Sequence, residues 1–454
     1  MTAMGSFSRD EVAGIASTIL LAMDAALPDS HSGGGVSGPS GGSPASWLLR
    51  ERLEWIRRFR RSVVEHQDNL IDLAADEVRK DPFETLVSDL VPLLSSCKWH
   101  ERHARRVLRP QRIRGASVWQ IGQRHRLHRE PLGLVGIIAT WNYPVQLLGV
   151  QLVQALVAGN RVVVKPSERC PKTQAKLLEI AGDAGLPEGT LRALEATREA
   201  GAAMLRDEPL DHLVFTGSTA VGREIAAAVG PRLIPSTLEL SGRDSAFVLR
   251  DADVRLAARS IGAAVRLNAG QTCMAPRRVL VDAGVADEFT TLLEAEVAKS
   301  GPLTDCGGNQ ATPTVERCLA GDELVTGDHF GPAIAVVSCD SVERMLEVHR
   351  GIGQHLATSI FSRDTAEARA LARRLGAGTV TINDTIIPTA HPGAPLPALG
   401  DSGWGLSRGE LGLLAMTRPV HVSMTSRRVR VPTDPPEAKQ VEQVKKFIRW
   451  WYGR

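Results

Sequence analysis

The sequence contains no run of about 18 uncharged apolar residues, the length that a membrane-spanning helix requires. The apolar stretch at residues 15–26 is too short and is interrupted by Asp24. No basic segment precedes it, as would be typical of a secretory signal. We therefore expect no transmembrane segment and a cytoplasmic location.

Closely spaced cysteine pairs are also absent. The six cysteines include no Cys-x-x-Cys motif and lie far apart in a long chain. This spacing predicts reduced thiols, and it does not fit a disulfide framework. The six are Cys97, Cys170, Cys273, Cys306, Cys318 and Cys339.

Excess charge is small, at a formal +3, but it is unevenly distributed. Nine arginines lie between His100 and Glu130. Such a cluster is typical either of a nucleic-acid surface or of a solvated helix and strand, for example at a subunit interface. No RNP, zinc-finger or helix-turn-helix pattern accompanies it, so we expect no nucleic-acid partner.

The chain of 454 residues is too long for one ordinary core and predicts two or three domains. Residues 1–45 read as a short helix followed by a Gly/Ser-rich linker. Helical patterns follow at 46–80 and 82–106. His100 and His103 have a spacing that permits metal binding, but nothing completes a site, so a solvated helix face and no metal are predicted.

Apolar strands alternate with helices over residues 131–238, which predicts a doubly wound, parallel α/β domain of the nucleotide-binding type. A second α/β segment with a shortened stretch near 301–327 spans 239–407. Residues 117–130 resemble exposed strands. Residues 441–452 form a basic amphipathic pattern that could touch a membrane surface or, more in keeping with the whole chain, pack onto a subunit.

One cysteine lies in a turn of small and polar residues before a strand at 278–281. Gly270 allows close backbone approach, and a Cys273 thiolate there could attack an electrophilic carbon near backbone N–H groups. The alternative is a buried structural cysteine. These residues alone do not decide between the two.

Three further motifs carry polar groups at strand ends. Gly217 to Gly222 joins a strand to a helix start that favours a pyrophosphate, although Gly-x-Gly-x-x-Gly itself is absent. Lys165 and Glu168 end a parallel strand, either as ligands for ribose or phosphate or as a surface ion pair. Glu239 is flanked by leucines, and partial burial would raise its pKa toward that of a general base.

Five motifs in this order make the chain resemble the aldehyde dehydrogenase superfamily over residues 46–425. The first motif and the ending at 401–405 are most similar to the class 3 branch, which acts on fatty and aromatic aldehydes. The motifs are Trp141-Asn142-Tyr143-Pro144, Lys165-Pro166-Ser167-Glu168, Gly217-Ser218-Thr219-Ala220-Val221-Gly222, Leu238-Glu239-Leu240-Ser241-Gly242 and Gly270-Gln271-Thr272-Cys273.

The resemblance implies NAD(P)-dependent oxidation of an aldehyde to a carboxylic acid through a thiohemiacetal and a thioester on Cys273. Asn142 would hold the oxyanion and Glu239 would activate water. NAD, or NADP, would be the cofactor, and a homodimer is implied. The cofactor-binding residues would be Trp141, Lys165, Glu168, Gly217, Ser218, Val221, Asp328 and Phe330.

The domains implied are an NAD(P)-binding domain (46–116 and 131–238), a catalytic domain (239–407) and oligomerisation segments (117–130 and 408–454). Asp328 stands where the family has a glutamate that holds the nicotinamide ribose, and its side chain is one methylene shorter. The interval between Cys273 and Asp328 is also shorter than the corresponding interval in the family. Two alternatives stay open: an impaired family member acting as a binding or structural subunit, and a CoA-acylating relative, against which Glu239 argues.

Overall fold

The computed structural model describes residues 47–115, 122–425 and 437–453. The helix expected within residues 1–30, the Gly/Ser-rich tract and residues 117–121 lie outside this part. The described chain forms a main unit (47–108 and 130–418) and a smaller unit built from 109–129 and the segment after 418. None of the described helices combines the length and hydropathy needed to span a bilayer.

The first sheet of the main unit is the predicted parallel sheet with one antiparallel strand added at its edge. Its order is β17-β7-β6-β3-β4-β5, and β17 runs antiparallel to β7. The strands are β3 (Leu134–Ile138), β4 (Arg161–Lys165), β5 (Leu191–Ala193), β6 (His212–Gly217), β7 (Ser236–Leu240) and β17 (Gly403–Trp404).

Both faces of this sheet are covered because its strands are apolar on both sides. Val162 and Val164 pack under α2, α5, α6 and α7, whereas Val163 between them faces α8 and α9. The helices are α2 (Leu49–Glu65), α3 (Gln67–Val78), α4 (Pro82–Thr85), the π-helical turn η1 (Leu86–Leu90), α5 (Val91–Leu108), α6 (Gln146–Ala158), α7 (Pro171–Asp183), α8 (Arg198–Asp207), α9 (Thr219–Val229) and α15 (Gly409–Ala415).

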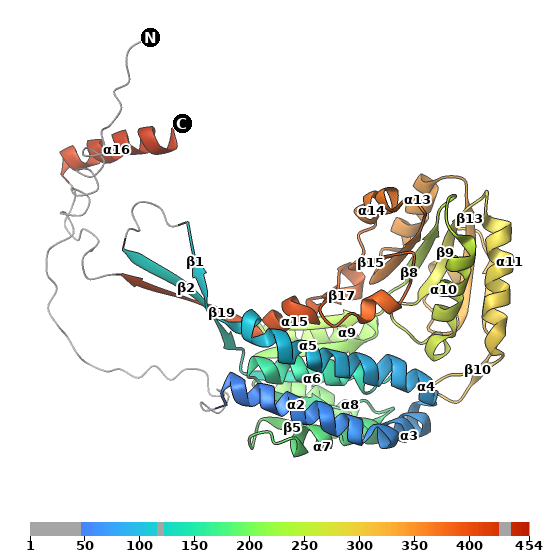
Figure 1. The fold of residues 1–454 in the computed structure, drawn as a ribbon, viewed down its shortest axis with the longest axis horizontal. Helices are drawn as coiled ribbons and strands as arrows, with labels where there is room; N and C mark the ends of the chain where they lie inside the picture. Colours follow the sequence, from blue (N-terminus) through green and yellow to red (C-terminus); the bar gives the residue numbers. More distant parts are fainter. Residues whose placement is uncertain (1–46, 116–121, 426–436, 454) are drawn as a thin grey trace, which may run out of the picture. The chain divides into compact units, whose positions relative to one another are not determined.

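The second sheet is parallel throughout, in the order β12-β13-β9-β8-β14-β15. Its helices α10 and α11 cover one face and α13 and α14 the other (Figure 1). The strands are β8 (Asp244–Val248), β9 (Pro276–Asp282), β12 (Thr314–Arg317), β13 (Ala333–Cys339), β14 (Ala357–Phe361) and β15 (Thr379–Ile382). The helices are α10 (Val254–Arg266), α11 (Ala286–Val297), α12 (Glu323–Thr326), α13 (Val342–Ile352) and α14 (Thr365–Ala372).

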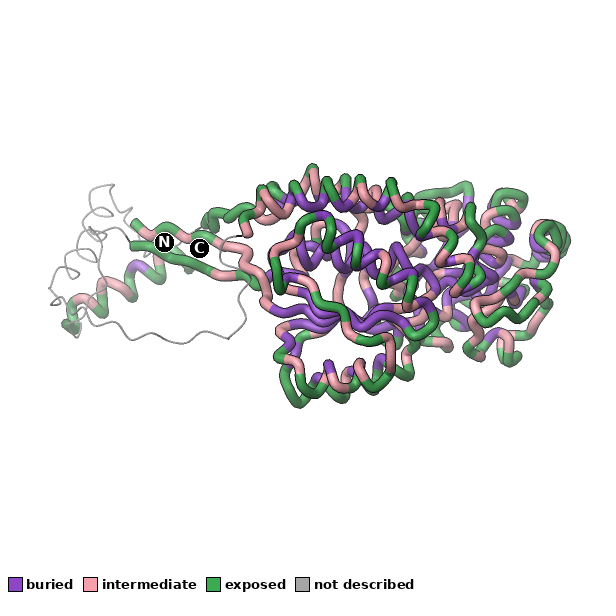
Figure 2. The backbone as a smooth tube through the Cα atoms, turned by 90° about the horizontal axis from the view of Figure 1, so that it is seen from below, coloured by how far each residue is buried: buried purple, intermediate pink, exposed green. Residues whose placement is uncertain are grey.

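Short elements complete the main unit. The segment expected to be shortened forms the hairpin β10–β11 and then β12, which lies parallel to β13 at the sheet edge. Buried residues run through the middle of the unit (Figure 2). The remaining bounds are β10 (Leu303–Thr304), β11 (Gln310–Ala311), β16 (Leu396–Pro397), β18 (Leu406–Ser407), η3 (Gly230–Arg232), η4 (Leu267–Gly270), η5 (Ala298–Ser300), η6 (Ile387–Ala390) and η7 (Gly400–Ser402).

The smaller unit contains a three-stranded sheet in the order β1-β2-β19 and the C-terminal helix α16. The strands predicted around 117–130 are found as β2, and the predicted helix at 441–452 begins slightly earlier. The bounds are β1 (Gln111–Ile113), β2 (Gln123–Pro131), β19 (Thr417–Thr425) and α16 (Ala438–Tyr452).

Two features differ from expectation. His100 is fully buried in α5, with Nδ1 2.8 Å from the carbonyl oxygen of Ser96, so the predicted solvated face is wrong for this residue. Residues 408–418, grouped with the oligomerisation segment above, belong to the main unit because α15 packs on α5 and α6. The other domain boundaries stay predictions.

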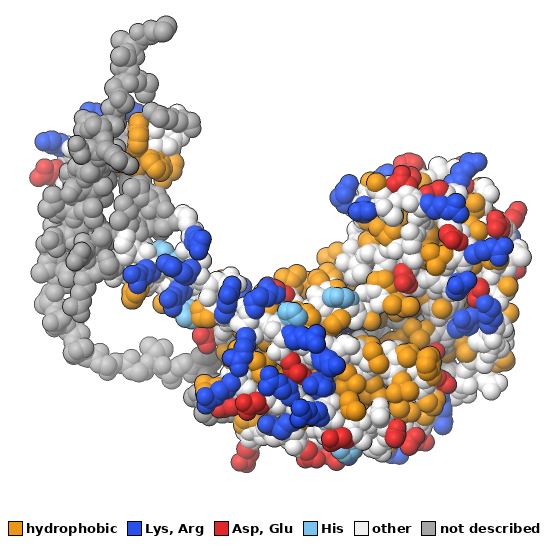
Figure 3. All heavy atoms as spheres, viewed as in Figure 1, with side chains coloured by type: hydrophobic (Ala, Val, Ile, Leu, Met, Phe, Trp, Pro, Cys, Tyr) orange, Lys and Arg blue, Asp and Glu red, His pale blue; other side chains and the backbone are white. Residues whose placement is uncertain are grey.

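The arginine cluster divides between the two units. Arg102, Arg105 and Arg106 are exposed on α5 in the main unit, where Lys and Arg side chains gather over α2 and α5 (Figure 3). Arg106 pairs with Glu410 at 2.7 Å. The other six arginines fall within residues 109–129 of the smaller unit.

Candidate active site

The first sheet presents the carboxyl ends of its parallel strands to the site, as open α/β sheets do when they bind ligands. Lys165 ends β4 and Gly217 ends β6. Glu239 lies near the end of β7, where it is paired in register with Thr216 of β6. The strand pattern therefore brings these three predicted residues to one edge.

The second sheet supplies residues that lie just before its strands. Cys273 precedes β9, and Asp328 and Phe330 precede β13. The turn from 268 to 273, called the nucleophile turn below, contains Asn268, Ala269 and Gly270 at φ 52°, 51° and 74°. Left-handed backbone is unfavourable for non-glycine residues, so the surrounding contacts must hold this turn.

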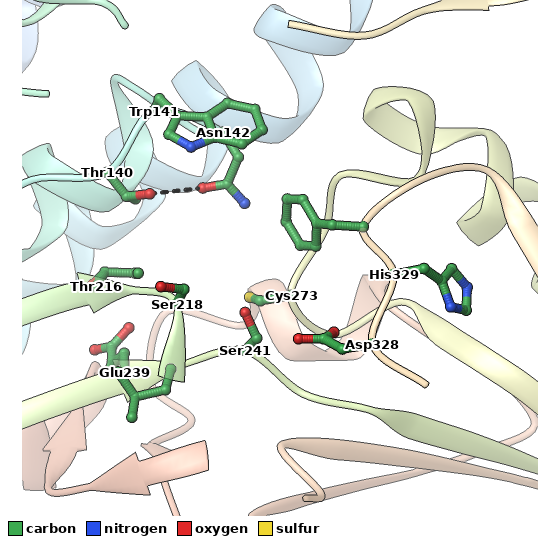
Figure 4. A pocket seen from close by; sticks show the side chains of 13 residues that line it. Thr140, Trp141, Asn142, Thr216, Ser218, Glu239, Ser241, Cys273, Asp328 and His329 are labelled. Atoms are coloured by element: carbon green, nitrogen blue, oxygen red, sulfur yellow. Dashed lines mark hydrogen bonds between the residues drawn. The ribbon is translucent and has the colours of Figure 1, made fainter. Parts of the chain in front are cut away.

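A cavity of about 270 Å³ joins these elements. Asn142 and Cys273 face its centre, and Glu239 and Asp328 lie on opposite sides of Cys273 (Figure 4). Its lining residues are Thr140, Trp141, Asn142, Thr216, Gly217, Ser218, Glu239, Leu240, Ser241, Cys273, Asp328, His329 and Phe330.

The side-chain amide of Asn142 is fixed from both ends. Its Nδ2 donates to the carbonyl oxygen of Gln271 at 3.1 Å, and its Oδ1 accepts from the hydroxyl of Thr140 at 3.4 Å. An amide NH₂ has two donors. Within the described residues one N–H of Asn142 therefore stays available beside Cys273, which is the requirement for binding an oxyanion.

Glu239 is buried, and its Oε1 has no hydrogen-bond partner among the described residues. Burial raises the pKa of this carboxyl, and the nearby groups of Ser407, Arg408 and Gln151 oppose that increase. A buried carboxyl with a raised pKa and an oxygen free to accept a proton is suited to general-base chemistry.

Cys273 is a partly exposed residue that lines the cavity. Burial, with a smaller contribution from the charge of Glu239, raises the pKa of its thiol to about 11, although Arg408 and Arg277 act in the opposite direction. The carbonyl oxygen of Cys273 accepts from the N–H of Gly242 at 3.2 Å. The thiol is therefore held mainly protonated near neutral pH in this state.

A second, larger cavity of about 860 Å³ shares five lining residues with the first, namely Thr140, Trp141, Thr216, Gly217 and Ser218. We call it the groove. Its volume lies in the range of small-molecule and cofactor sites. The predicted residues Lys165, Glu168 and Val221 line it, away from Cys273.

The groove has the donors that a dinucleotide requires. Lys165 is buried and pairs with Glu168. Ser218 caps α9 by accepting from the N–H of Val221 at 3.4 Å, and this helix start faces the groove. Free N–H groups at a helix start favour phosphate. These residues fit an NAD(P) cofactor.

The last two predicted cofactor residues line the smaller cavity. The ring of Phe330 lies 5.9 Å from that of Trp141 in an edge contact, and the guanidinium of Arg277 lies 5.1 Å from the Phe330 ring centre. The shortened segment thus still brings Asp328 and Phe330 to the cavity that contains Cys273.

Sequence reasoning missed two buried arginines. Arg277 donates from Nη1 to the carbonyl oxygen of Gly270 at 2.8 Å and from Nη2 to that of Thr272 at 2.9 Å. Arg408 donates to the carbonyl oxygen of Thr389 at 2.7 Å. The sequence position of Arg277, four residues after Cys273, could have indicated that it lies near the site. No comparable signal in the sequence points to Arg408.

The family model described as "Aldehyde dehydrogenase family" matches residues 43–305 and 294–422. A Methylomonas 4,4'-diapolycopene aldehyde oxidase is 27% identical over 447 residues, covering 89% of this chain and 84% of that protein. A Pseudomonas coniferyl aldehyde dehydrogenase is 28% identical over 409 residues, covering 80% and 84%. A Mycolicibacterium smegmatis protein, provisionally named an NADP⁺-dependent succinate-semialdehyde dehydrogenase, is 30% identical over 433 residues, covering 86% and 82%.

Solved structures share the fold. The substrate-bound Staphylococcus aureus AldH has a TM-score of 0.81 at 22% identity, covering 88% of this chain and 95% of that one. A Mycobacterium tuberculosis aldehyde dehydrogenase complexed with NAD⁺ has a TM-score of 0.77 at 24% identity, covering 88% of each. The chain belongs to the aldehyde dehydrogenase family and is an NAD(P)-dependent aldehyde dehydrogenase.

Proposed function

We propose that Cys273 is the nucleophile with which this enzyme oxidises an aldehyde to a carboxylic acid. Its thiol gives up its proton to solvent, its sulfur bonds to the aldehyde carbon, and the electron pair of the carbonyl π bond moves onto the oxygen. The N–H of Asn142 holds the resulting oxyanion. The nicotinamide, when bound, supplies the hydride acceptor for the hydrogen on that carbon. Glu239 then takes a proton from water, which adds to the thioester and breaks the carbon–sulfur bond.

One observation carries this proposal. Cys273, Asn142 and Glu239 come from three separate segments and line a single cavity that adjoins a groove of cofactor size. A structural cysteine would not need a buried, unpartnered carboxylate oxygen beside it, because such an atom is costly.

We further propose that Lys165 and Glu168 hold the adenosine ribose, with Gly217, Ser218 and Val221 lining the groove. NAD is the preferred cofactor, since the carboxylate of Glu168 would repel an added 2′-phosphate. Trp141, Asp328 and Phe330, which line the smaller cavity, would enclose the nicotinamide end.

The proposed assembly is a cytoplasmic homodimer that uses the sheet β1-β2-β19. All three residues of β1 and most of β19 are exposed. A small exposed sheet is suited to pairing with a second copy. Light scattering during gel filtration tests this, and a monomer at micromolar concentration would contradict it.

The activity is tested by NAD(P)H absorbance with straight-chain and aromatic aldehydes, with and without CoA. We expect CoA-independent turnover that Cys273→Ala abolishes while cofactor binding is unchanged. Turnover only with CoA would support an acylating enzyme, and cofactor binding without turnover would support an impaired subunit. Near-native turnover of Cys273→Ala would refute the nucleophile assignment.

A further inference from the structure

A fully buried ion pair contacts the loop that carries Asn142. Nζ of Lys80 is 2.6 Å from Oδ2 of Asp89, and both side chains are completely inaccessible. No other ion pair of the described chain has both partners fully buried. Burying two charges is unfavourable unless further hydrogen bonds complete their coordination, so the remaining partners of this pair indicate its purpose.

Asp89 directs its second oxygen to the start of α6. Oδ1 accepts from the backbone N–H of Val145 at 3.0 Å and of Gln146 at 2.8 Å. These donors belong to residues 140–146, called the oxyanion loop below, which carries Asn142. Asp89 lies in η1, and π-helical turns are frequent at functional sites.

Lys80 contacts the same loop at two further points. Its Nζ donates to the backbone carbonyl oxygen of Asn142 at 3.2 Å and lies 3.7 Å from the centre of the Tyr143 ring. The pair therefore holds the oxyanion loop by one carbonyl group, one ring and two N–H groups.

Two more hydrogen bonds, besides that from Nδ2 of Asn142 to the carbonyl oxygen of Gln271, join this loop to the nucleophile turn. The hydroxyl of Tyr143 lies 2.5 Å from Oγ1 of Thr272, the residue before Cys273. Nδ2 of Asn268 donates both to the carbonyl oxygen of Asn142 at 2.9 Å and to that of Gln271 at 3.1 Å. The carbonyl group of Asn142 is thus shared by Lys80 and the nucleophile turn.

A third charged residue from the same stretch holds the left-handed start of the turn. Glu84, on α4 between Lys80 and Asp89, accepts from the backbone N–H of Asn268 at 2.9 Å. Residues 80–89 therefore contact both the oxyanion loop and the nucleophile turn. Glu84 and Asn268 make this contact although they lie 184 positions apart in the sequence.

We propose that Lys80 and Asp89 are positioning residues that set the Asn142 amide against Cys273, with the Tyr143–Thr272 hydrogen bond fixing the nucleophile turn to that placement. The inference rests on the roles proposed above for Asn142 and Cys273. The pair does not line the groove. Its loss should therefore slow the chemical step and leave cofactor affinity unchanged.

The experiment compares wild type, Lys80→Met and the double variant Lys80→Met/Asp89→Leu, whose apolar side chains leave no unpaired buried charge. We expect kcat to fall about 10- to 100-fold in both variants, as when an oxyanion contact is misplaced, with the Kd for NAD⁺ within twofold. Arg60→Met is the matched control, because it breaks the half-buried Arg60–Glu101 pair without touching either loop.

A double variant that melts like wild type and keeps kcat within twofold overturns the proposal. If neither pair variant folds, Tyr143→Phe decides: the expected result is a lower kcat with unchanged cofactor affinity, and an unchanged kcat rejects the link to the turn.

Alkylation of Cys273 by iodoacetamide, measured by peptide mass spectrometry, needs no turnover. It should become several-fold faster at pH 8 in the pair variants, because a released turn exposes the thiol to water. Wild type without turnover would refute the proposed function, whereas unchanged alkylation in a folded pair variant would refute only the positioning role.

Discussion

The Cys273 thiol offers the sharpest test of the site, because its surroundings act on its pKa in known directions. Burial raises the pKa from the ordinary 9.0 to about 11, and the charge of Glu239 contributes to that increase. At pH 8 the thiolate fraction is about 0.1 for a thiol with a pKa of 9.0 and about 0.001 for one with a pKa of 11.

Iodoacetamide reacts with the thiolate, and a thiolate of higher pKa is intrinsically about tenfold more nucleophilic over two pKa units. The cofactor-free enzyme should therefore be alkylated at Cys273 about tenfold more slowly than N-acetylcysteine at pH 8. The rate should still increase about tenfold per pH unit up to pH 10. Restricted access would slow the reaction equally at all pH values and would not move the midpoint. A rate that levels off below pH 9 would refute the reasoning.

The perturbation is Glu239→Gln, which removes the negative charge and keeps the shape of the side chain. Without that charge the thiolate is less disfavoured, so the pKa of Cys273 falls and alkylation at pH 8 becomes faster. The control is Glu188→Gln, a surface carboxylate outside both cavities, which should leave the profile unchanged. An unaltered profile in Glu239→Gln would show that the two side chains do not interact.

Three further outcomes are expected. Gly270→Ala should destabilise the protein by at least ~1 kcal/mol and lower kcat, since φ is 74° and the new Cβ would lie 2.3 Å from the carbonyl of Gly331. Thermal melting and steady-state assays test this. The control is Gly182→Ala, whose Cβ meets nothing within 4 Å. Glu239→Gln should give a burst of NAD(P)H and then stall in stopped flow, and an undiminished steady state would remove it as the base. Lys165→Met should raise the Kd for NAD⁺ about tenfold, or ~1.4 kcal/mol, in a fluorescence titration, and an unchanged Kd would remove Lys165 from cofactor binding.

Much of the first sheet was predictable because its strands are apolar and end in polar residues. Lys165 and Gly217 could be assigned to the carboxyl edge from that pattern alone. The antiparallel pairing of β17 with β7 could not be predicted. It brings Gly403 beside Glu239, which lies 164 positions earlier, and local sequence patterns contain no information about such distant pairings.

The errors and omissions share a physical cause. His100 was placed on a solvated face because helical spacing reports which residues share a face, and not what covers that face. Lys80 and Asp89 look like ordinary charges in helical segments, and their burial depends on a loop 62 and 56 positions away. Charge inside a core can be recognised only when its partners are known.

The shortened segment after Cys273 raised the question of whether the cofactor-binding residues beyond it could still reach the thiol. Its hairpin β10–β11 carries Cys306, whose backbone N–H donates to Oε1 of Gln271 at 3.2 Å, inside the nucleophile turn. Arg169, from the cofactor side, donates to Sγ of Cys306 at 3.1 Å and lies 4.7 Å from the Trp141 ring centre.

The hairpin therefore joins the nucleophile turn to the groove side of the site. The chain then runs through β12, parallel to β13, and returns through α12 to Asp328 ahead of β13. A short connection that is fixed at both ends leaves the residues after it fewer alternative positions than a long loop would, since the conformational freedom of a loop grows with its length. For this chain, shortening the segment is compatible with an assembled cavity because the remaining residues contact the turn that carries Cys273.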